Sequence, residues 1–326
     1  MFDLLIIGAG PSGLSCAIEA QRAGLSTVVL EKGSVVDAIR RFPTGLIWFS
    51  TPELLEIGNI PFVIPTTRPT RVDAINYYQR VAAYFKLDVR TFDGVESVRR
   101  DGDGFLVRTE RGKEYRSRNV VVATGYYDHP NTLGVPGEDL PNVAHYYREP
   151  FEFFGRAVAV VGGRNSAVEA ALDLFRHGAR VTLIHRGPEL SKGVKYWILP
   201  DIENRIKNGE IRALFNSVVS EIRSESILVT TQQGMLELEN DFTFVLIGFH
   251  PDTTHLRSYG VAIDPETLAP VHDPETLETN VPGLYVCGSI VAGKNNNKIF
   301  VENGRLHGAT IVSAIMKRNA RQSLTQ

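Results

Sequence analysis

Cysteine is scarce in this chain of 326 residues, which contains only Cys16 and Cys287. Two thiols so far apart in the sequence provide no CxxC pair, no thiolate metal cluster and no disulfide framework. The eight histidines also lack a paired spacing such as H-x-x-x-H, so we predict no metal site. We expect both cysteines to be buried structural residues, because a free cysteine packs like a small apolar side chain.

Long apolar runs and an excess of charge of one sign are also lacking. The chain has 35 Lys and Arg against 37 Asp and Glu, and its basic residues are scattered. That balance predicts no partner among nucleic acids or anionic membranes. No stretch approaches the ~20 apolar residues that cross a bilayer, and the apolar run Leu4–Ile7 has no basic residues before it, as a signal peptide would. We therefore expect a soluble, cytoplasmic protein.

What the chain does have is one glycine-rich pattern twice. GAGPSG spans Gly8–Gly13, GGRNSA spans Gly162–Ala167, and their first glycines lie 154 positions apart. The same shift places Gly24 on Gly178 and aligns the apolar strands that follow. The first copy follows an apolar strand and opens a helix, which is the context that a dinucleotide-binding G-x-G-x-x-G requires. We interpret the two copies as a duplicated βαβ nucleotide-binding unit.

The residues after each copy predict which nucleotide it binds. Glu31 ends the second strand of the first copy, where its carboxylate can accept hydrogen bonds from an unphosphorylated ribose. The second copy has His185 and Arg186 there, which attract a 2′-phosphate that a carboxylate would repel. The pattern therefore predicts FAD in the first copy and NADPH in the second. Arg164 replaces the glycine found at Gly10, and we hypothesise that it supplies charge to the NADPH pyrophosphate.

Alternating helices and strands continue through the chain. We predict helices at 71–84 and 200–208, antiparallel strands near 88–92, 95–99, 105–109 and 113–116, and further strands at 119–123, 242–247 and 283–287. After 248 the chain must return to the first domain to supply its last strand and helix. The predicted FAD-binding domain is therefore discontinuous, 1–123 and 249–326, and the NADPH-binding domain is 124–248.

Several long sequence stretches carry a family resemblance. They are ATG at 123–125, TNVPGLYVCGS at 279–289, FSTPELLEIGNIPF at 49–62, ATGYYDHPNTLGVPGEDLP at 123–141, GGRNSAVEAAL at 162–172, WILP at 197–200 and NKIFVENGRLHG at 297–308. Through them the chain resembles the thioredoxin-reductase-like flavoproteins and, over nearly its whole length, the YpdA family of bacillithiol-disulfide (bacilliredoxin) reductases. The resemblance implies an α/β fold with two Rossmann-like dinucleotide-binding domains, for FAD and NADPH, of the pyridine-nucleotide disulfide reductase type. It also implies a homo-oligomer.

Two family features are missing from this sequence. The redox CxxC of thioredoxin reductases would begin 18 residues before Gly162, at Ala144, where no cysteine is present. The YpdA cysteine within the first fingerprint corresponds to Ser12, which cannot form a mixed disulfide. Cys16, one helical turn further along, is an alternative thiol, but burial would raise its pKa. No catalytic residue is therefore assigned with certainty.

The motif matches assign cofactor-binding residues. For FAD they are Gly8, Gly10, Pro11, Ser12, Gly13, Glu31, Lys32, Ser50, Val95, Ala123, Thr124, Gly125, Gly288, Ser289, Ile299 and Phe300. For NADPH they are Gly162, Gly163, Arg164, Asn165, Ser166, His185 and Arg186. Asn297 is the expected N-cap of the last helix. For Glu302, Asn303 and His307, both a flavin-side role and ordinary helix polarity are open.

The predicted reaction is hydride transfer from NADPH to the flavin and on to a low-molecular-weight disulfide such as bacillithiol disulfide, or to a small redox protein. One alternative is a flavin-containing monooxygenase, but its F-x-G-x-x-x-H signature would need Phe at Asp139 and Gly at Pro141. A second alternative is a ferredoxin or flavodoxin reductase, whose similar forms usually carry a longer C-terminal extension. A third is a non-catalytic NADPH-sensing module.

Overall fold

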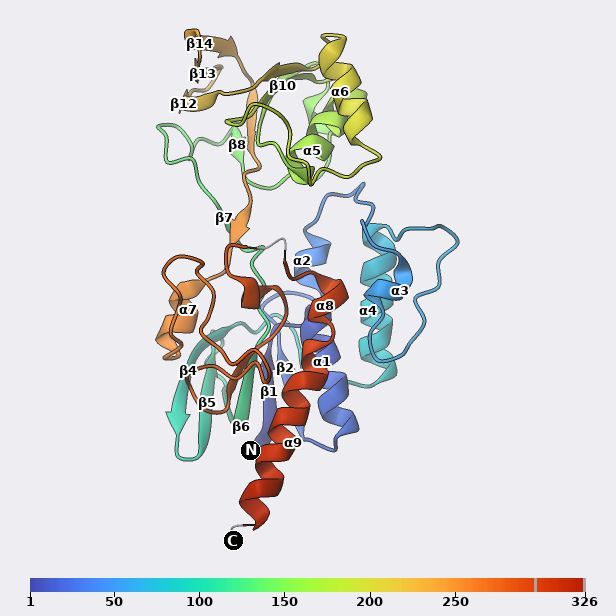
Figure 1. The fold of residues 1–326 in the computed structure, drawn as a ribbon, viewed down its shortest axis with the longest axis vertical. Coiled ribbons are helices and arrows are strands. Elements are labelled where there is room, and N and C mark those ends of the chain that lie inside the picture. Colours follow the sequence, from blue (N-terminus) through green and yellow to red (C-terminus); the bar gives the residue numbers. More distant parts are fainter. Residues whose placement is uncertain (296–297, 325–326) are drawn as a thin grey trace. The chain divides into compact units, whose positions relative to one another are not determined.

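The computed structural model describes residues 1–295 and 298–324, and these form two compact units. The first unit comprises 1–41, 47–129 and the chain from Phe249 to the C-terminal end; the second comprises 42–46 and 130–248. Figure 1 shows the course of the chain. The units differ at 42–46 and 124–129 from the domain boundaries drawn from the sequence, which remain predictions.

The first unit is built on a seven-stranded sheet, ordered β3-β2-β1-β6-β5-β4, with β17 also paired to β6. The strands are β1 (Phe2–Ile7), β2 (Thr27–Leu30), β3 (Val89–Arg90), β4 (Val95–Asp101), β5 (Gly104–Thr109), β6 (Glu114–Val122) and β17 (Leu284–Val286). Strands β1, β2, β3, β6 and β17 are parallel, whereas β4 and β5 run antiparallel to their neighbours. The inner strands are almost fully buried apolar runs, as expected of a parallel sheet covered on both faces.

The helices of the first unit are α1 (Pro11–Arg22), α2 (Asp37–Arg40), α3 (Pro52–Leu55), α4 (Arg71–Tyr84), α7 (Thr253–Ser258), α8 (Val301–Gly304) and α9 (His307–Leu324), with a 3-10 turn η2 at Gly288–Ala292. Helix α9 runs beside α1 (Figure 1). Only glycine fits at Gly308, because a Cβ there would lie 2.6 Å from the Cα of Cys16. Helix α4 starts in a reciprocal Thr70–Asp73 capping box, which explains its sharp N-terminus.

The second unit has a five-stranded sheet ordered β11-β10-β9-β15-β8 and a three-stranded sheet ordered β12-β13-β14. Its elements are β8 (Val143–Ala144), η1 (Phe151–Phe153), β9 (Ala157–Val161), α5 (Asn165–Arg176), β10 (Arg180–Ile184), α6 (Leu199–Lys207), β11 (Arg212–Leu214), β12 (Val218–Ile222), β13 (Ser226–Thr231), β14 (Gly234–Glu239) and β15 (Phe242–Val245). Where the chain crosses between units, β7 (His129–Pro130) pairs with β16 (Phe249–His250).

The predicted duplication is confirmed, because β1-α1-β2 and β9-α5-β10 have the same order and parallel pairing. The glycines that end the two helices, Gly24 and Gly178, both have positive φ, at 75° and 85°. Such a left-handed residue is what terminates an α-helix most readily.

Three expectations are wrong in detail. The strands predicted at 113–116 and 119–123 form one strand, β6, whose alternating half pairs with β5 and whose buried half lies between β1 and β17. Strand β3 pairs parallel to β2, not antiparallel. The last helix is two helices, α8 and α9.

No helix of the described residues is long and apolar enough to span a membrane.

Candidate functional site

The first fingerprint can only be made with glycine at two of its positions. Gly8 has φ +109°, and a Cβ there would lie 2.6 Å from the carbonyl oxygen of Ala123. A Cβ at Gly13 would lie 2.1 Å from the carbonyl oxygen of Gly8. The turn between β1 and α1 therefore packs tightly against itself and against the end of β6. These contacts leave no room for any side chain at either position.

Gly10 is different, because a Cβ built there meets no atom within 4 Å. Gly10 is the N-cap of α1 and makes no side-chain capping hydrogen bond, and Pro11 follows at the first helical position. The first turn of a helix has backbone N–H groups without intrahelical partners and a positive dipole end. Open space beside uncapped N–H groups fits a phosphate group.

Glu31 connects the fingerprint to the end of β2. Its carboxylate accepts hydrogen bonds from the backbone N–H of Ala9 at 2.7 Å and of Gly33 at 2.8 Å. Burial raises the pKa of Glu31, and these two N–H groups only partly offset that effect. A carboxylate has about four lone-pair positions, so it can still accept from ribose hydroxyls. Sequence reasoning assigned Glu31 to the ribose and missed that it also fixes the fingerprint loop.

Ser12 is enclosed by two glycines that come from the far end of the sequence. A Cβ at Gly288 would lie 2.7 Å from the Ser12 hydroxyl oxygen, and one at Gly304 would lie 3.0 Å from it. Gly125 in turn would bring a Cβ within 3.5 Å of the Ser289 hydroxyl oxygen. The structure thus brings many of the predicted FAD residues together at the β1–α1 turn: Gly8, Gly10, Pro11, Ser12, Gly13, Ala123, Thr124, Gly125, Gly288 and Ser289.

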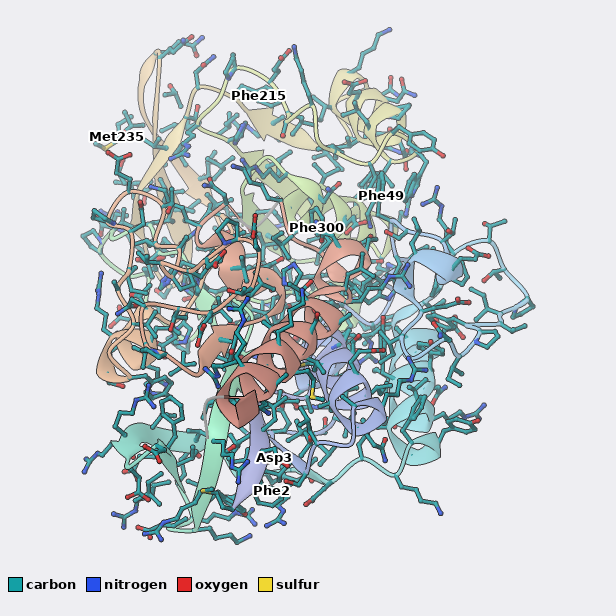
Figure 2. All side chains as sticks on the ribbon, turned by 60° about the horizontal axis from the view of Figure 1, so that its bottom comes forward. Phe2, Asp3, Phe49, Phe215, Met235 and Phe300 are labelled. Atoms are coloured by element: carbon teal, nitrogen blue, oxygen red, sulfur yellow. The ribbon has the colours of Figure 1, made fainter. Side chains whose placement is uncertain are left out.

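Other predicted FAD residues have partners of their own. Lys32 forms an ion pair with Asp128 at 2.7 Å, and the Ser50 hydroxyl donates a hydrogen bond to Glu302. Phe300, labelled in Figure 2, is 51% exposed and precedes α8 as its N-cap. Val95 is buried at the start of β4. Ile299 is half-buried, and its side chain is 3.4 Å from the position of a Cβ on Gly304. The predicted N-cap Asn297 lies outside the described residues.

Both cysteines are fully buried, as expected. Burial raises the pKa of Cys16 to about 12 and raises that of Cys287 well above its ordinary value. The sulfur of Cys287 lies 3.6 Å from the backbone oxygen of Ser12. Neither thiol is a thiolate near neutral pH, which is the form that reacts with disulfides.

The second fingerprint repeats the close packing of the first. Gly162 has φ +146°, and a Cβ there would lie 2.5 Å from the carbonyl oxygen of Leu246. The His185 ring lies between two glycines, with its atoms 2.4 Å from a Cβ position on Gly163 and 2.7 Å from one on Gly187. The glycines therefore create the slot that holds this imidazole.

The structure gives His185 and Arg186 different charges. Burial, and then the Arg186 guanidinium, lower the pKa of His185, so the ring is neutral at pH 7. Arg186 is exposed and supplies the positive charge at this position. His185 can therefore contribute a hydrogen bond but not a charge, and the contact of both residues with a 2′-phosphate stays a prediction.

Asn165 has a structural role that the sequence did not indicate. Its amide donates to the carbonyl of Gly193 at 3.0 Å and accepts from the backbone N–H of Lys195 at 2.8 Å. The backbone N–H of Ser191 donates to the carbonyl of Gly163 at 2.9 Å. These bonds hold the 191–195 segment over the N-terminus of α5.

Two further features belong to this end of α5. The buried Lys195 ammonium forms an ion pair with Glu169, one turn into the helix. Both residues were missed, although Lys195 lies two positions before the WILP stretch. Arg164 and Ser166 are exposed at the start of α5, which has no side-chain cap. Among the residues that the structure describes, no group of three His, Cys, Asp or Glu side chains could hold a metal ion.

Comparisons with known proteins give the family. Residues 5–288 match the model of the pyridine nucleotide-disulphide oxidoreductases. The chain is 44% identical to the Bacilliredoxin reductase Bdr of Bacillus subtilis over 316 residues, 96% of this chain and 97% of that protein. Two solved structures of bacillithiol disulfide reductase Bdr (YpdA) are similar: that of Bacillus cereus at 43% identity and TM-score 0.95, and that of Staphylococcus aureus at 38% and 0.94. The alignments cover 97% of this chain and 99% and 98% of those chains.

The match confirms an oxidoreductase that uses a flavin and a nicotinamide nucleotide, and it favours the disulfide-reductase prediction over the monooxygenase and ferredoxin reductase alternatives. The predicted resemblance is also confirmed. The chain therefore belongs to the pyridine nucleotide-disulphide oxidoreductase family, in its Bdr (YpdA) branch.

Proposed function

We propose that the first unit binds FAD at the β1–α1 turn. The observation that carries this proposal is the contrast between the closed positions Gly8 and Gly13 and the open position Gly10 at an uncapped helix N-terminus. The open side fits a pyrophosphate, and Glu31 lies at the correct strand end for the adenosine ribose. Pro11, Ser12, Lys32, Ser50, Val95, Ala123, Thr124, Gly125, Gly288, Ser289, Ile299 and Phe300 complete the proposed contact set.

The second unit would bind NADPH through Gly162, Gly163, Arg164, Asn165, Ser166, His185 and Arg186. Arg186 attracts the 2′-phosphate by charge, and the neutral imidazole of His185 adds a hydrogen bond. Asn165 contributes by holding the neighbouring loop. The bound nucleotides would supply the hydride and the two-electron carrier, and the protein orients them and shields them from water.

The proposed acceptor is a low-molecular-weight disulfide of the bacillithiol type or a small redox protein such as a bacilliredoxin, as the names of the similar Bdr proteins suggest. The net reaction is NADPH + H⁺ + RSSR giving NADP⁺ + 2 RSH. Ser12 replaces the cysteine that the YpdA resemblance places in the first fingerprint, and Cys16 and Cys287 are buried. We therefore propose that turnover uses no thiol of the enzyme. A homo-oligomer in the cytoplasm remains a prediction.

Anaerobic stopped-flow absorbance tests the proposal with the FAD-loaded protein. NADPH should bleach the flavin, and bacillithiol disulfide or an oxidised bacilliredoxin should restore its colour. Glutathione disulfide, ferredoxin and oxygen serve as competing acceptors. Failure of NADPH to bleach the flavin would contradict every enzymatic assignment. Fast reoxidation of the flavin by ferredoxin alone would contradict the proposal that the electron acceptor is a disulfide.

Nucleotide choice is tested separately with Arg186→Ala. Loss of a charge-assisted phosphate contact should raise the KM for NADPH by about tenfold or more, with little change for NADH. Arg212→Ala, at an exposed arginine of the same unit, is the control. Equal effects of Arg186→Ala on both nucleotides would show that this side chain does not contact the 2′-phosphate.

A further inference from the structure

We propose that His307 is a positioning residue for the flavin-binding turn at Gly288 and Ser289, with its imidazole acting as a fixed hydrogen-bond acceptor. The proposal rests on the FAD assignment above. The backbone N–H of Gly288 donates to Nδ1 of His307 at 3.1 Å. This contact joins residues 19 positions apart and connects the start of α9 to the strand end where the cofactor contacts gather.

The position of Gly288 matters because it packs directly on Ser12. Gly288 has φ +77°, so it turns the chain out of β17 in a conformation that other residues adopt at a cost. A Cβ at this position would lie 2.7 Å from the Ser12 hydroxyl oxygen. A small displacement of Gly288 would therefore move either Ser12 or the turn that contains Ser289. The bond to His307 is the contact that fixes the direction of the Gly288 N–H.

The imidazole is itself held by close packing of α9. Gly308 fits against the backbone of Cys16 with no room for a side chain, which fixes the first turn of α9 on α1. The Ser15 hydroxyl donates to the carbonyl of Arg305 at 2.6 Å, which fixes the residues just before α9. Packing on α1 thus fixes the position of His307, and His307 in turn accepts the hydrogen bond from Gly288.

Only the neutral imidazole can accept at Nδ1, since the protonated ring carries a hydrogen on both nitrogens. Burial lowers the pKa of His307, and the nearby His272 lowers it further, so the ring is neutral at pH 7. The other titratable or charged groups on the packed elements are Cys16, Glu19 and Arg22 on α1, Cys287 beside Gly288, and Glu302 and Arg305 in and after α8. Acidification should therefore convert this acceptor into a donor that opposes the Gly288 N–H.

Two substitutions separate positioning from simple packing. In His307→Asn the side-chain oxygen takes the place of Nδ1 on the same carbon and does not titrate. In His307→Leu the acceptor is lost and the buried N–H of Gly288 has no partner. His255→Asn, on the exposed helix α7, is the matched control. The measurement is the Kd for FAD of the full-length apoprotein, by flavin fluorescence, from about pH 8 to about pH 5 around the ordinary histidine pKa.

We expect His307→Leu to raise the Kd for FAD about tenfold at pH 8, where the wild-type imidazole still accepts from Gly288, because an unpartnered buried donor weakens the turn. That difference from the wild type should shrink on acidification, as the wild-type ring itself stops accepting. The wild type should lose FAD affinity on acidification, and His307→Asn should lose less. Burial raises the pKa of Glu31, so protonation of this carboxylate on acidification gives all variants a common decline in FAD affinity, and only the difference between variants is diagnostic.

An identical pH dependence in His307→Asn and the wild type would overturn the proposal, and so would a wild-type Kd in His307→Leu. If the Leu variant does not fold, the comparison of Asn with the wild type still decides. Failure of the wild type itself to bind FAD would instead overturn the proposed function.

Discussion

Replacing Gly10 by alanine should separate cofactor binding from folding. The N-cap conformation of Gly10, φ −73° and ψ 173°, is ordinary for alanine. A Cβ there meets no protein atom within 4 Å. A glycine-to-alanine change at such a compatible site alters stability by about 0.4–1 kcal/mol in the favourable direction, because the unfolded chain loses freedom. Alanine is a poorer N-cap residue than glycine by a similar amount. The melting temperature of the apoprotein should therefore stay within a few degrees of the wild-type value.

The same methyl group should weaken FAD binding, because it occupies the space through which the backbone would meet the pyrophosphate. Loss of that approach should cost about 2 kcal/mol, on the order of a thirtyfold rise in the Kd for FAD. Flavin fluorescence gives the Kd, and thermal unfolding of the apoprotein gives the stability.

Gly13→Ala is the matched opposite, since its Cβ would lie 2.1 Å from the carbonyl oxygen of Gly8. Overpacking of this kind costs about 1–3 kcal/mol, or a fall of several degrees in melting temperature. A Gly10→Ala protein that is stable and binds FAD like the wild type would refute the reasoning, because no phosphate would then approach at Gly10.

Three further predictions follow from burial and charge. Cys16→Ser should keep disulfide-reductase turnover, and maleimide treatment of the native enzyme should leave that activity intact. If either treatment abolishes disulfide reduction while NADPH still reduces the flavin, a thiol of the enzyme takes part in turnover. Lys195→Met should lower the free energy of unfolding by about 1–2 kcal/mol, because it removes the ion-pair partner of the partly exposed Glu169. The double change with Glu169→Leu should recover part of that loss in a denaturant titration. Burial acts to raise the pKa of Asp128, but Lys32 and Arg41 together outweigh it and the pKa lies below its ordinary value, so this carboxylate contributes stability above about pH 4 that is lost as the pH falls. Asp128→Asn should therefore weaken the dependence of the unfolding free energy on pH in the acidic range. An unchanged dependence would contradict a lowered pKa of Asp128 in the folded protein.

Much of the fold could be predicted because it repeats. The 154-residue shift between Gly8 and Gly162 identified both βαβ units, since each turn needs glycine for backbone reasons alone. The strand β6 was divided in two because its alternating and buried halves read as different patterns. Periodicity describes each half correctly but cannot show that one strand has different neighbours along its length.

The site was harder to predict where side chains contact distant backbone. Nothing in the sequence near Asn165 indicates that its amide holds the loop at Lys195, and nothing near His307 indicates an acceptor for Gly288. His185 was predicted from its position after the strand, but its neutral state depends on burial between Gly163 and Gly187. Such contacts depend on three-dimensional neighbours that spacing alone does not give.

The two hydrogen bonds that the Glu31 carboxylate accepts from the backbone N–H groups of Ala9 and Gly33 also limit how the first unit can vary in length. A single residue inserted into α1 would rotate the end of the helix by about 100° and advance it by about 1.5 Å, and β2 would have to absorb that offset. The carboxylate would then lose its reach to Ala9. Insertions and deletions should therefore occur in the surface loops after β2. The separation of 22 positions between Ala9 and Glu31 should stay constant.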